Sequence, residues 1–482
     1  MSSGIKGNVL PLGDSQIFTS TEQYLGQGER SELFSSRPLG KREASTDNTE
    51  ERAVKIIKKQ LDFGPSRADK PVEKPFPVLG DFSLFNNKKV TIFSEFGEEK
   101  APFLTNPNIP FFSPTRLSRL SFKSIFIANP DPSKEDLEWI GKVEESLKLA
   151  TSCDTEESLR NALALERVEN QGINTSYLCK ILTDEVDETG KRKIVIGGVL
   201  KFGDEEVGTE RNSSRDILRS KVGISPGKSL FRECIASGLH PDRIPCTIKV
   251  TFTTIKGTER VASLQKYIPN AREIHTLNVP EASLHIPIEE VFEMAFVDLR
   301  LVNTDRNRGN ALLPKDSYSM LYLIDHGCVL SEGFKDRAIF CWGSWSQTEF
   351  GFSDVYKQKI AELNIENDRM ICKNAFPEIS DGVLKCLGLS TFLLQESVLL
   401  DLSLKQIASF YFSPYPSLEM PSFAANLYEK ICEKVSSIEE FDSLAKESVK
   451  LGPKWVKEYT SLSENTKSLE SFLYRKIADL TL

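Results

Sequence analysis

Apolar and polar residues are arranged differently in the two halves of the chain, and the change predicts two kinds of structure. Between Thr175 and Lys266, short apolar runs are bounded by polar turns, which is typical of strands. We predict a helix at 228–239 and strands at 175–182, 193–201, 247–255 and 259–266. Beyond residue 286, apolar residues recur at helical spacing, which predicts helices at 288–296, 384–400, 403–410, 424–435, 438–449 and 466–480. A strand-rich part followed by a helical part indicates an α+β fold with a β-rich N-lobe and a helical C-lobe.

The first 130 residues lack such a pattern. Pro, Ser, Asn and Gly recur there, so we expect a largely irregular, partly disordered arm. Its phenylalanines are available to dock onto a folded body: Phe82, Phe85, Phe93, Phe96, Phe103, Phe111 and Phe112. The stretch 116–123 mixes basic and apolar residues, as a membrane-surface contact, a phosphorylation site or an ordinary solvated segment would.

Helices are expected to lead from this arm into the strands. Ser133 followed by Asp136 resembles a capping box, and apolar residues follow at helical spacing. A second helix is predicted at 155–168. The predicted organisation is an arm at 1–130, a helical lead-in at 131–168, an N-lobe at 169–270, a C-lobe at 271–420 and terminal helices at 421–482.

The amino-acid composition argues against several classes of protein. The 482 residues carry a formal net charge of -8, which argues against a protein that coats nucleic acid. The 9 cysteines are odd in number and form no CxxC pair, as expected for reduced thiols in the cytoplasm. The first residues are polar, without a signal-peptide pattern, and no run of about 18 apolar residues predicts a membrane-spanning helix.

One set of residues has the order that phosphoryl transfer requires. Lys201 ends an apolar strand and Glu233 lies on the following predicted helix, as in the ion pair that holds ATP phosphates in kinases. Asp305 and Asn310 are separated by five positions, which is the spacing of a kinase catalytic loop. A short apolar run then delivers Asp325 into a glycine turn, as in a metal-binding DFG segment. Each piece alone is typical of a polar loop, but the ordered set favours a kinase.

These motifs resemble the phosphatidylinositol 3-/4-kinase superfamily, and most closely the phosphatidylinositol 4-kinase gamma type. The resemblance extends over roughly residues 160–410 and rests mainly on two motifs, Asn303-Thr-Asp-Arg-Asn-Arg-Gly-Asn310 and Ile324-Asp-His-Gly327. Weaker matches are 168–177 to the nucleotide-covering loop, 200–206 to the lysine strand, 263–267 to the adenine hinge and 342–353 to a stretch after the metal loop.

The resemblance implies a protein-kinase-like fold and a role for each matching residue. Lys201 would contact the ATP phosphates, oriented by Glu233, and Asp305 would be the catalytic aspartate. Asn310 and Asp325 would hold Mg²⁺ or Mn²⁺. The residues implied to contact the nucleotide elsewhere are Ser176 in the covering loop and the hinge residues Gln265, Lys266 and Tyr267.

Two features depart from the family pattern. The covering loop has only Gly172, followed by Ile173 and Asn174, so backbone N–H groups would approach phosphates less easily. The polar stretch 210–215 also fits poorly. The segment 223–229 resembles a P-loop, but its spacing is one residue short and no apolar strand precedes it, so we expect a loop into the Glu233 helix.

Three functions remain open from the sequence. The first is a lipid kinase that phosphorylates the 4-hydroxyl of phosphatidylinositol, with peripheral membrane contact by a cytoplasmic protein. The second is a protein kinase on the same fold, because some relatives of this type act on protein. The third is a nucleotide-binding pseudokinase that serves as a scaffold, which the thin covering loop favours and the intact Lys201, Asp305 and Asp325 set opposes.

Overall fold

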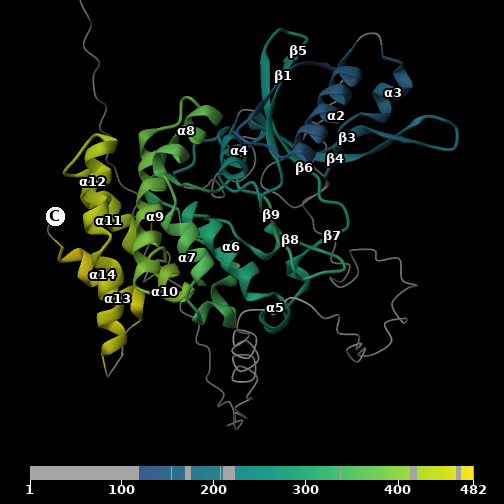
Figure 1. Ribbon diagram of the computed structural model, residues 1–482. Coiled ribbons are helices and arrows are strands. Elements are labelled where there is room, and N and C mark those ends of the chain that lie inside the picture. The colour runs from purple at the N-terminus through teal and green to yellow at the C-terminus, as the bar shows by residue number, and fades with distance from the viewer. Residues whose placement is uncertain are drawn as a thin grey trace, which may run out of the picture. The chain divides into compact units, whose positions relative to one another are not determined.

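The computed structural model in Figure 1 describes most of the chain beyond residue 118. The described residues are 119–152, 155–168, 175–206, 208–209, 223–336, 338–412, 421–462, 468–480 and 482. The arm phenylalanines, Gly172 to Asn174 of the covering loop and the polar stretch 210–215 therefore lie outside the described residues.

The first half of the described chain forms a six-stranded antiparallel sheet. In spatial order its strands are β1 (Leu120–Ile127), β5 (Thr247–Thr254), β6 (Glu259–Lys266), β4 (Arg192–Phe202), β3 (Ser176–Val186) and β2 (Glu166–Arg167). Asp187 forms the β3–β4 turn because its carboxylate accepts the N–H groups of Thr189 and Lys191, and Gly190 takes a φ of 77° there. The four predicted strands are thus confirmed.

Helix α2 (Lys134–Thr151) covers one face of this sheet by packing against β1 and β3. Its first turn is capped by the Ser133 hydroxyl, which accepts the N–H of Asp136, as the sequence predicted. On the sheet side, Trp139 donates its indole N–H to the carbonyl of Gly197 at 2.8 Å. The buried side chains of α2 and the sheet form a hydrophobic core of their own.

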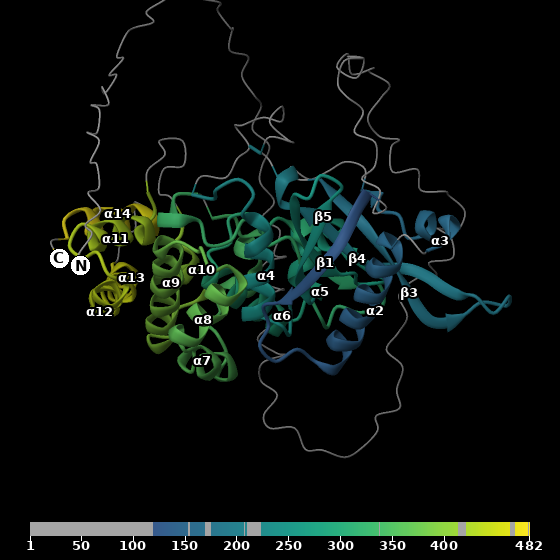
Figure 2. The same cartoon turned by 90° about the horizontal axis from the view of Figure 1, so that it is seen from above.

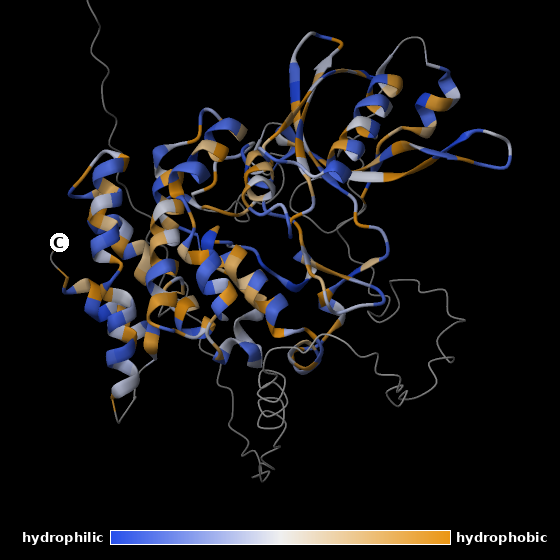
Figure 3. Ribbon diagram, in the orientation of Figure 1, coloured by the Kyte–Doolittle hydropathy of each residue, from blue (hydrophilic) through white to orange (hydrophobic). Residues whose placement is uncertain are grey.

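The second half of the described chain is largely helical. Its main elements are α5 (Val279–His285), α6 (Ile288–Arg300), α7 (Asp354–Ala361), α8 (Ile365–Ala375), α9 (Asp381–Leu399), α10 (Leu404–Ala408), α11 (Phe423–Cys432), α12 (Ile438–Ser448), α13 (Leu451–Ser461) and α14 (Leu469–Ala478). Helix α9 contacts α6, α7, α8, α11, α12 and α13, and its neighbours surround it in both views (Figures 1 and 2). Buried apolar residues of these helices give this half a second core. Figure 3 shows hydrophobic and hydrophilic positions alternating along the same helices.

Two further elements join these halves. Helix α4 (Ser229–Leu239) contacts β5 and β6 as well as α8, and the side chains of Cys234, Ile235 and Ala236 belong to the core of the helical half. A small sheet of β7 (Ala271–Glu273), β8 (Ala311–Pro314) and β9 (Tyr322–Leu323) follows the end of β6. The described chain therefore has a mixed α+β architecture, with an antiparallel sheet followed by a largely helical region.

Two expectations about secondary structure were wrong. Residues 120–127, expected in an irregular arm, form β1, and the 116–123 stretch enters this strand at Leu120, whose side chain is buried. The helix predicted at 155–168 is only α3 (Glu157–Ala162), because β2 follows it. Among the described residues, α9 is long and apolar enough to cross a membrane by length and composition, yet most of it is buried inside the protein.

Candidate active site

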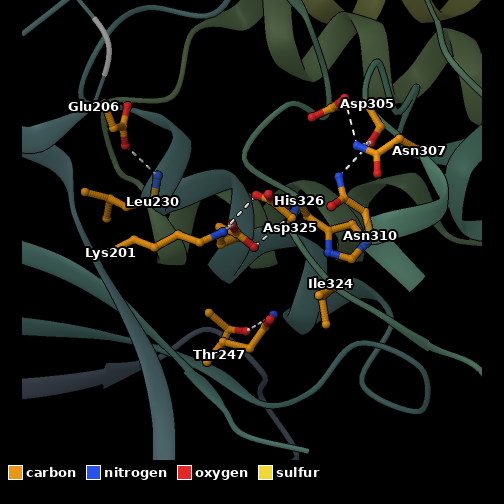
Figure 4. Close-up of polar contacts among 12 residues, drawn as sticks. Lys201, Glu206, Leu230, Thr247, Asp305, Asn307, Asn310, Ile324, Asp325 and His326 are labelled. Atoms are coloured by element: carbon orange, nitrogen blue, oxygen red, sulfur yellow. Dashed lines mark hydrogen bonds and ion pairs between the residues drawn. The ribbon is translucent and has the colours of Figure 1, made fainter. Parts of the chain in front are cut away.

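Three charged side chains from separate elements meet beside the sheet. The ammonium of Lys201 on β4 lies 2.7 Å from Oε1 of Glu233 on α4 and 2.8 Å from Oδ1 of Asp325, which follows β9 (Figure 4). Glu233 is almost fully buried, Lys201 is 21% exposed, and Asp325 is the most accessible of the three at 44%. The structure thus brings together three residues that the sequence placed in one site.

The electrostatics of this group favour the charged forms of Lys201 and Asp325. Burial would lower the pKa of Lys201, but the carboxylates of Asp325 and Glu233 outweigh it and raise the pKa above its usual range. The ammonium of Lys201 in turn lowers the pKa of Asp325. Burial raises the pKa of Glu233, an effect that the Lys201 ammonium opposes. The site therefore presents a fixed cation held by two acids at neutral pH.

The position of Glu233 depends on how α4 begins. The carboxylate of Glu206, just after β4, accepts the backbone N–H groups of Ser229 at 3.1 Å and Leu230 at 3.0 Å (Figure 4). An acid at a helix N-terminus satisfies otherwise unpaired donors and interacts favourably with the helix dipole. The strand that carries Lys201 is therefore tied directly to the helix that carries Glu233.

The acidic loop that contains Glu206 is itself fixed. Arg260 on β6 forms ion pairs with Asp204 and Glu205, each at 2.7 Å, and Glu205 also accepts the hydroxyl of Tyr177 at 2.7 Å. The guanidinium of Arg260 stacks 3.9 Å above the ring of Phe202. The polar residues after Lys201 thus serve to hold the loop in place.

The predicted catalytic loop follows helix α6 and is held by its own side chains. Asn303 donates its amide to Asp298 at 2.9 Å and accepts the N–H of Asp305 at 2.9 Å. The carboxylate of Asp305 is partly exposed and accepts a hydrogen bond from Asn307 at 3.3 Å (Figure 4). Asn310 donates its amide to the carbonyl of Asp305 at 2.8 Å. The five-residue spacing therefore closes a compact loop.

A buried arginine that the sequence did not single out connects this loop to the Asp325 segment. Arg306 is fully buried, and its Nε lies 3.0 Å from Oδ1 of Asp298. Its Nη1 donates to the carbonyls of Asn310 and Ile324, and its Nη2 lies 2.7 Å from Nε2 of His326. One guanidinium therefore joins the end of α6, the catalytic loop and both sides of Asp325. A basic residue beside Asp305 was the available signal, but it is equally typical of a solvated loop.

Asp325 has an unusual backbone conformation. Its φ is 56°, in the left-handed region that residues other than glycine rarely occupy. The following N–H, of His326, donates to Oε2 of Glu233 at 2.9 Å. Gly327 lies so close to α4 that an added Cβ would meet Cβ of Ser229 at 2.9 Å. The glycine turn is therefore required for the chain to pass the helix.

The donors of Asn310 and Asp325 fit a hard divalent cation. Because the amide nitrogen of Asn310 donates to the loop, its side-chain oxygen remains as an acceptor, and Asp325 supplies a carboxylate. Mg²⁺ prefers oxygen ligands and is usually held by one or two protein groups together with substrate phosphates. No cluster of three or more His, Cys, Asp or Glu side chains suited to a metal occurs in the described residues.

The other residues predicted to contact the nucleotide, Ser176 and 265–267, lie in or next to strands of the sheet. Ser176 begins β3 directly opposite Lys201. The N–H groups of Lys266 and Tyr267 already donate within the sheet, to the carbonyls of Cys246 at 2.8 Å and Gly197 at 3.1 Å. Those two amides are therefore engaged, and the adenine role of 265–267 stays a prediction that requires other backbone groups.

Trp342 and Trp345 are buried in the helical core, and Trp342 donates its indole N–H to Asp298 at 3.0 Å. His326 is buried against Arg306. The P-loop-like segment 223–229 leads into α4. All described cysteines are free thiols.

Comparison with known proteins adds an independent line of information. No family model matches the chain. Phosphatidylinositol 4-kinase gamma 4 of Oryza sativa subsp. japonica is 32% identical over 253 residues, which cover 47% of this chain and 43% of that protein. Phosphatidylinositol 4-kinase gamma 6 of Arabidopsis thaliana is 30% identical over 276 residues, covering 49% and 42%. The chain is a distant homologue of the plant phosphatidylinositol 4-kinase gamma proteins.

The homology confirms the resemblance inferred from the sequence motifs. The chain spans less than half the length of these curated phosphatidylinositol 4-kinase gamma relatives. The homology supports the assignment of the chain to the kinase-family phosphotransferases, and such an enzyme uses ATP and a divalent metal. The antiparallel sheet followed by helices is consistent with a kinase-like fold.

Proposed function

We propose that the protein is an ATP-dependent kinase that transfers the γ-phosphate to a hydroxyl group, with the 4-hydroxyl of phosphatidylinositol as its acceptor. The observation that carries the proposal is the contact of Lys201 with both Glu233 and Asp325 beside the loop of Asp305 and Asn310. The distant homology to proteins named phosphatidylinositol 4-kinase gamma favours the lipid acceptor. In this proposal the sheet and the helical region are the two lobes of a kinase, divided near residue 270.

Each residue has a defined task in this reaction. Lys201, held by Glu233, binds the ATP phosphates as a point charge. Asp305 lies at the surface of the loop, where its carboxylate can accept the proton of the attacking hydroxyl. Asn310 and Asp325 hold the divalent cation, which neutralises charge on the phosphates when bound.

The acceptor determines where the protein acts. Phosphatidylinositol is embedded in a bilayer, so the proposed reaction requires a cytoplasmic protein that touches a membrane surface. The side of the protein nearest Asp305 would face the lipid, because the carboxylate has to reach the headgroup hydroxyl.

Radiolabelled ATP and Mg²⁺ test the proposal directly. The full chain is offered phosphatidylinositol vesicles and a mixed protein substrate side by side, with Asp325→Ala as the blank. Label in the lipid that disappears in the variant supports the lipid kinase. Label only in protein moves the assignment to a protein kinase, and a wild type that binds ATP without transferring label indicates a pseudokinase scaffold.

A further inference from the structure

A cavity lies beside helix α4 and is lined by residues other than Glu233. It has a volume of about 230 Å³ and is bordered by the segment before α4, the residues after Leu330 and the start of α9. One wall is apolar, formed by Phe231, Ile235, Phe376, Ile379 and Val383. The rings of Phe231 and Phe376 stack at 4.3 Å and close this wall.

The polar wall contains the buried guanidinium of Arg232. Arg232 is only 7% exposed and forms no ion pair with the described residues. Its Nη1 donates to the carbonyls of Val329 and Leu330, but its buried Nε has no hydrogen-bond partner among the described residues. Burial of this charge lowers the pKa of Arg232, an effect that nearby acidic groups such as Glu332 and Glu206 oppose only in part. A buried cation with a free donor is costly unless something else pairs with it.

A second cation lies at the same cavity. The ammonium of Lys228 sits 4.6 Å above the ring of Phe376, and its nearest carboxylate, Glu378, is 3.8 Å away and 83% exposed. The other acid at the cavity, Glu332, is engaged at the start of α9, where it accepts the hydroxyl of Ser380 at 3.1 Å. Neither acid forms an ion pair with Arg232, although the charge of Glu332 acts on the guanidinium from a distance.

We infer that this cavity binds a ligand that carries an anionic group on a small apolar body. The anion would accept hydrogen bonds from Arg232 and lie near Lys228, and the apolar part would rest on Phe231 and Phe376. The volume suits a single ring with one phosphate or carboxylate.

Such a ligand would influence the proposed active site through helix α4, which carries both Arg232 and Glu233. Arg232 neighbours Glu233 on α4 and donates to the carbonyls of Val329 and Leu330, downstream of Asp325. An anion on Arg232 would therefore strengthen the attachment of α4 to the segment that carries Asp325. The inference concerns binding alone, so it stands apart from the proposed transfer reaction.

Phenyl phosphate is a suitable probe for titration calorimetry on the full chain, with benzyl alcohol as its neutral counterpart and inorganic phosphate as the anion without a ring. We expect phenyl phosphate to bind more tightly than either. Because each charge-assisted hydrogen bond contributes appreciably, Arg232→Gln should weaken binding about tenfold or more. Lys228→Gln, at a side chain that is 38% exposed, should weaken it about threefold while leaving the fold unaffected.

Two controls locate the site. Lys249→Gln removes a cation that lies 5.7 Å from the ring centre of Phe231 and does not line the cavity, so the affinity of this variant should match that of wild type. Lys201→Met should also leave binding unchanged, which separates this cavity from the proposed ATP-phosphate site. The inference is overturned if wild type does not bind phenyl phosphate, if benzyl alcohol binds equally well, or if only Lys201→Met weakens binding.

Discussion

The backbone N–H of His326 donates a 2.9 Å hydrogen bond to Oε2 of Glu233, whose other oxygen holds Lys201. Glu233 thus positions both the lysine proposed to bind phosphate and the segment that carries Asp325. Its buried carboxylate is shared between a charge and a backbone amide, so the two contacts can be separated by substitution.

We expect Glu233→Gln to keep an acceptor for His326 but to lose the charge that holds Lys201. Phosphoryl transfer should fall about 100-fold in kcat/KM, within the range seen for a lost electrostatic contact in an active site. Steady-state kinetics at varied ATP provides the measurement. Glu185→Gln removes a largely exposed acid paired with Lys193 and should leave kinetics unchanged. An unaffected Glu233→Gln enzyme would contradict the role given to the acid.

Asp305→Ala should reduce transfer at least about 100-fold, since it removes the group proposed to accept the hydroxyl proton. Its carboxylate is partly exposed and contributes no core volume, so the thermal midpoint should shift by no more than a few degrees. Calorimetry and the label assay together provide the test. Asp187→Ala, in the distant β3–β4 turn, is the matched control for activity. Comparable turnover in wild type and Asp305→Ala would remove Asp305 from the mechanism.

Arg306→Met should destabilise the whole protein. The substitution leaves Asp298 buried without its cation and removes donors from two carbonyls, for a cost of about 3 kcal/mol in the free energy of unfolding. Urea denaturation measures this cost. Arg308→Met, in the same loop, loses a single hydrogen bond to the carbonyl of Leu277 and should cost only about 1 kcal/mol. Equal costs for the two variants would show that the buried contacts of Arg306 contribute no more to stability than the single hydrogen bond of Arg308.

Buried histidines should make stability depend on pH. Burial, with Arg300 nearby, holds the pKa of His240 well below 6.5. Below about pH 6.5 the unfolded chain therefore binds a proton that the folded chain does not. As the pH decreases through this range, the free energy of unfolding falls by up to about 1.4 kcal/mol per pH unit. Denaturation at pH 5, 6 and 7 should show this slope.

His240→Gln should remove its share of that slope, whereas His326, whose pKa is also well below 6.5, should keep contributing. His285 is exposed, so His285→Gln provides the control for the loss of a histidine that is not buried. A slope that is identical in wild type and His240→Gln would mean that His240 titrates normally in the folded protein.

The sequence predicted the parts of this protein that local patterns specify. The hairpin of β3 and β4 follows from apolar runs around the turn of Asp187, and the order of Lys201, Glu233 and Asp325 identified side chains that the fold brings into contact. Helices such as α9 and α12 were also predicted, with ends differing by a few residues because capping sets the ends.

Other elements could not be predicted because they depend on distant partners. The sequence of β1 mixes basic and apolar residues and does not by itself predict a strand. The strand forms because it pairs with β5. Helices α7 and α8 have too many polar residues for periodicity to reveal them. Burial of Arg306 is equally invisible, since its partners come from α6, the catalytic loop and the Asp325 segment.

The pairing of β1 with β5 has a practical consequence. A shortened protein that begins after Ile127 would uncover the hydrogen-bonding edge of β5, a strand whose Ile248, Val250 and Phe252 are fully buried. Open edges of this kind recruit strands from other molecules. Such a truncation would thus favour self-association through the exposed strand, and the residues from Leu120 onward protect the sheet against aggregation.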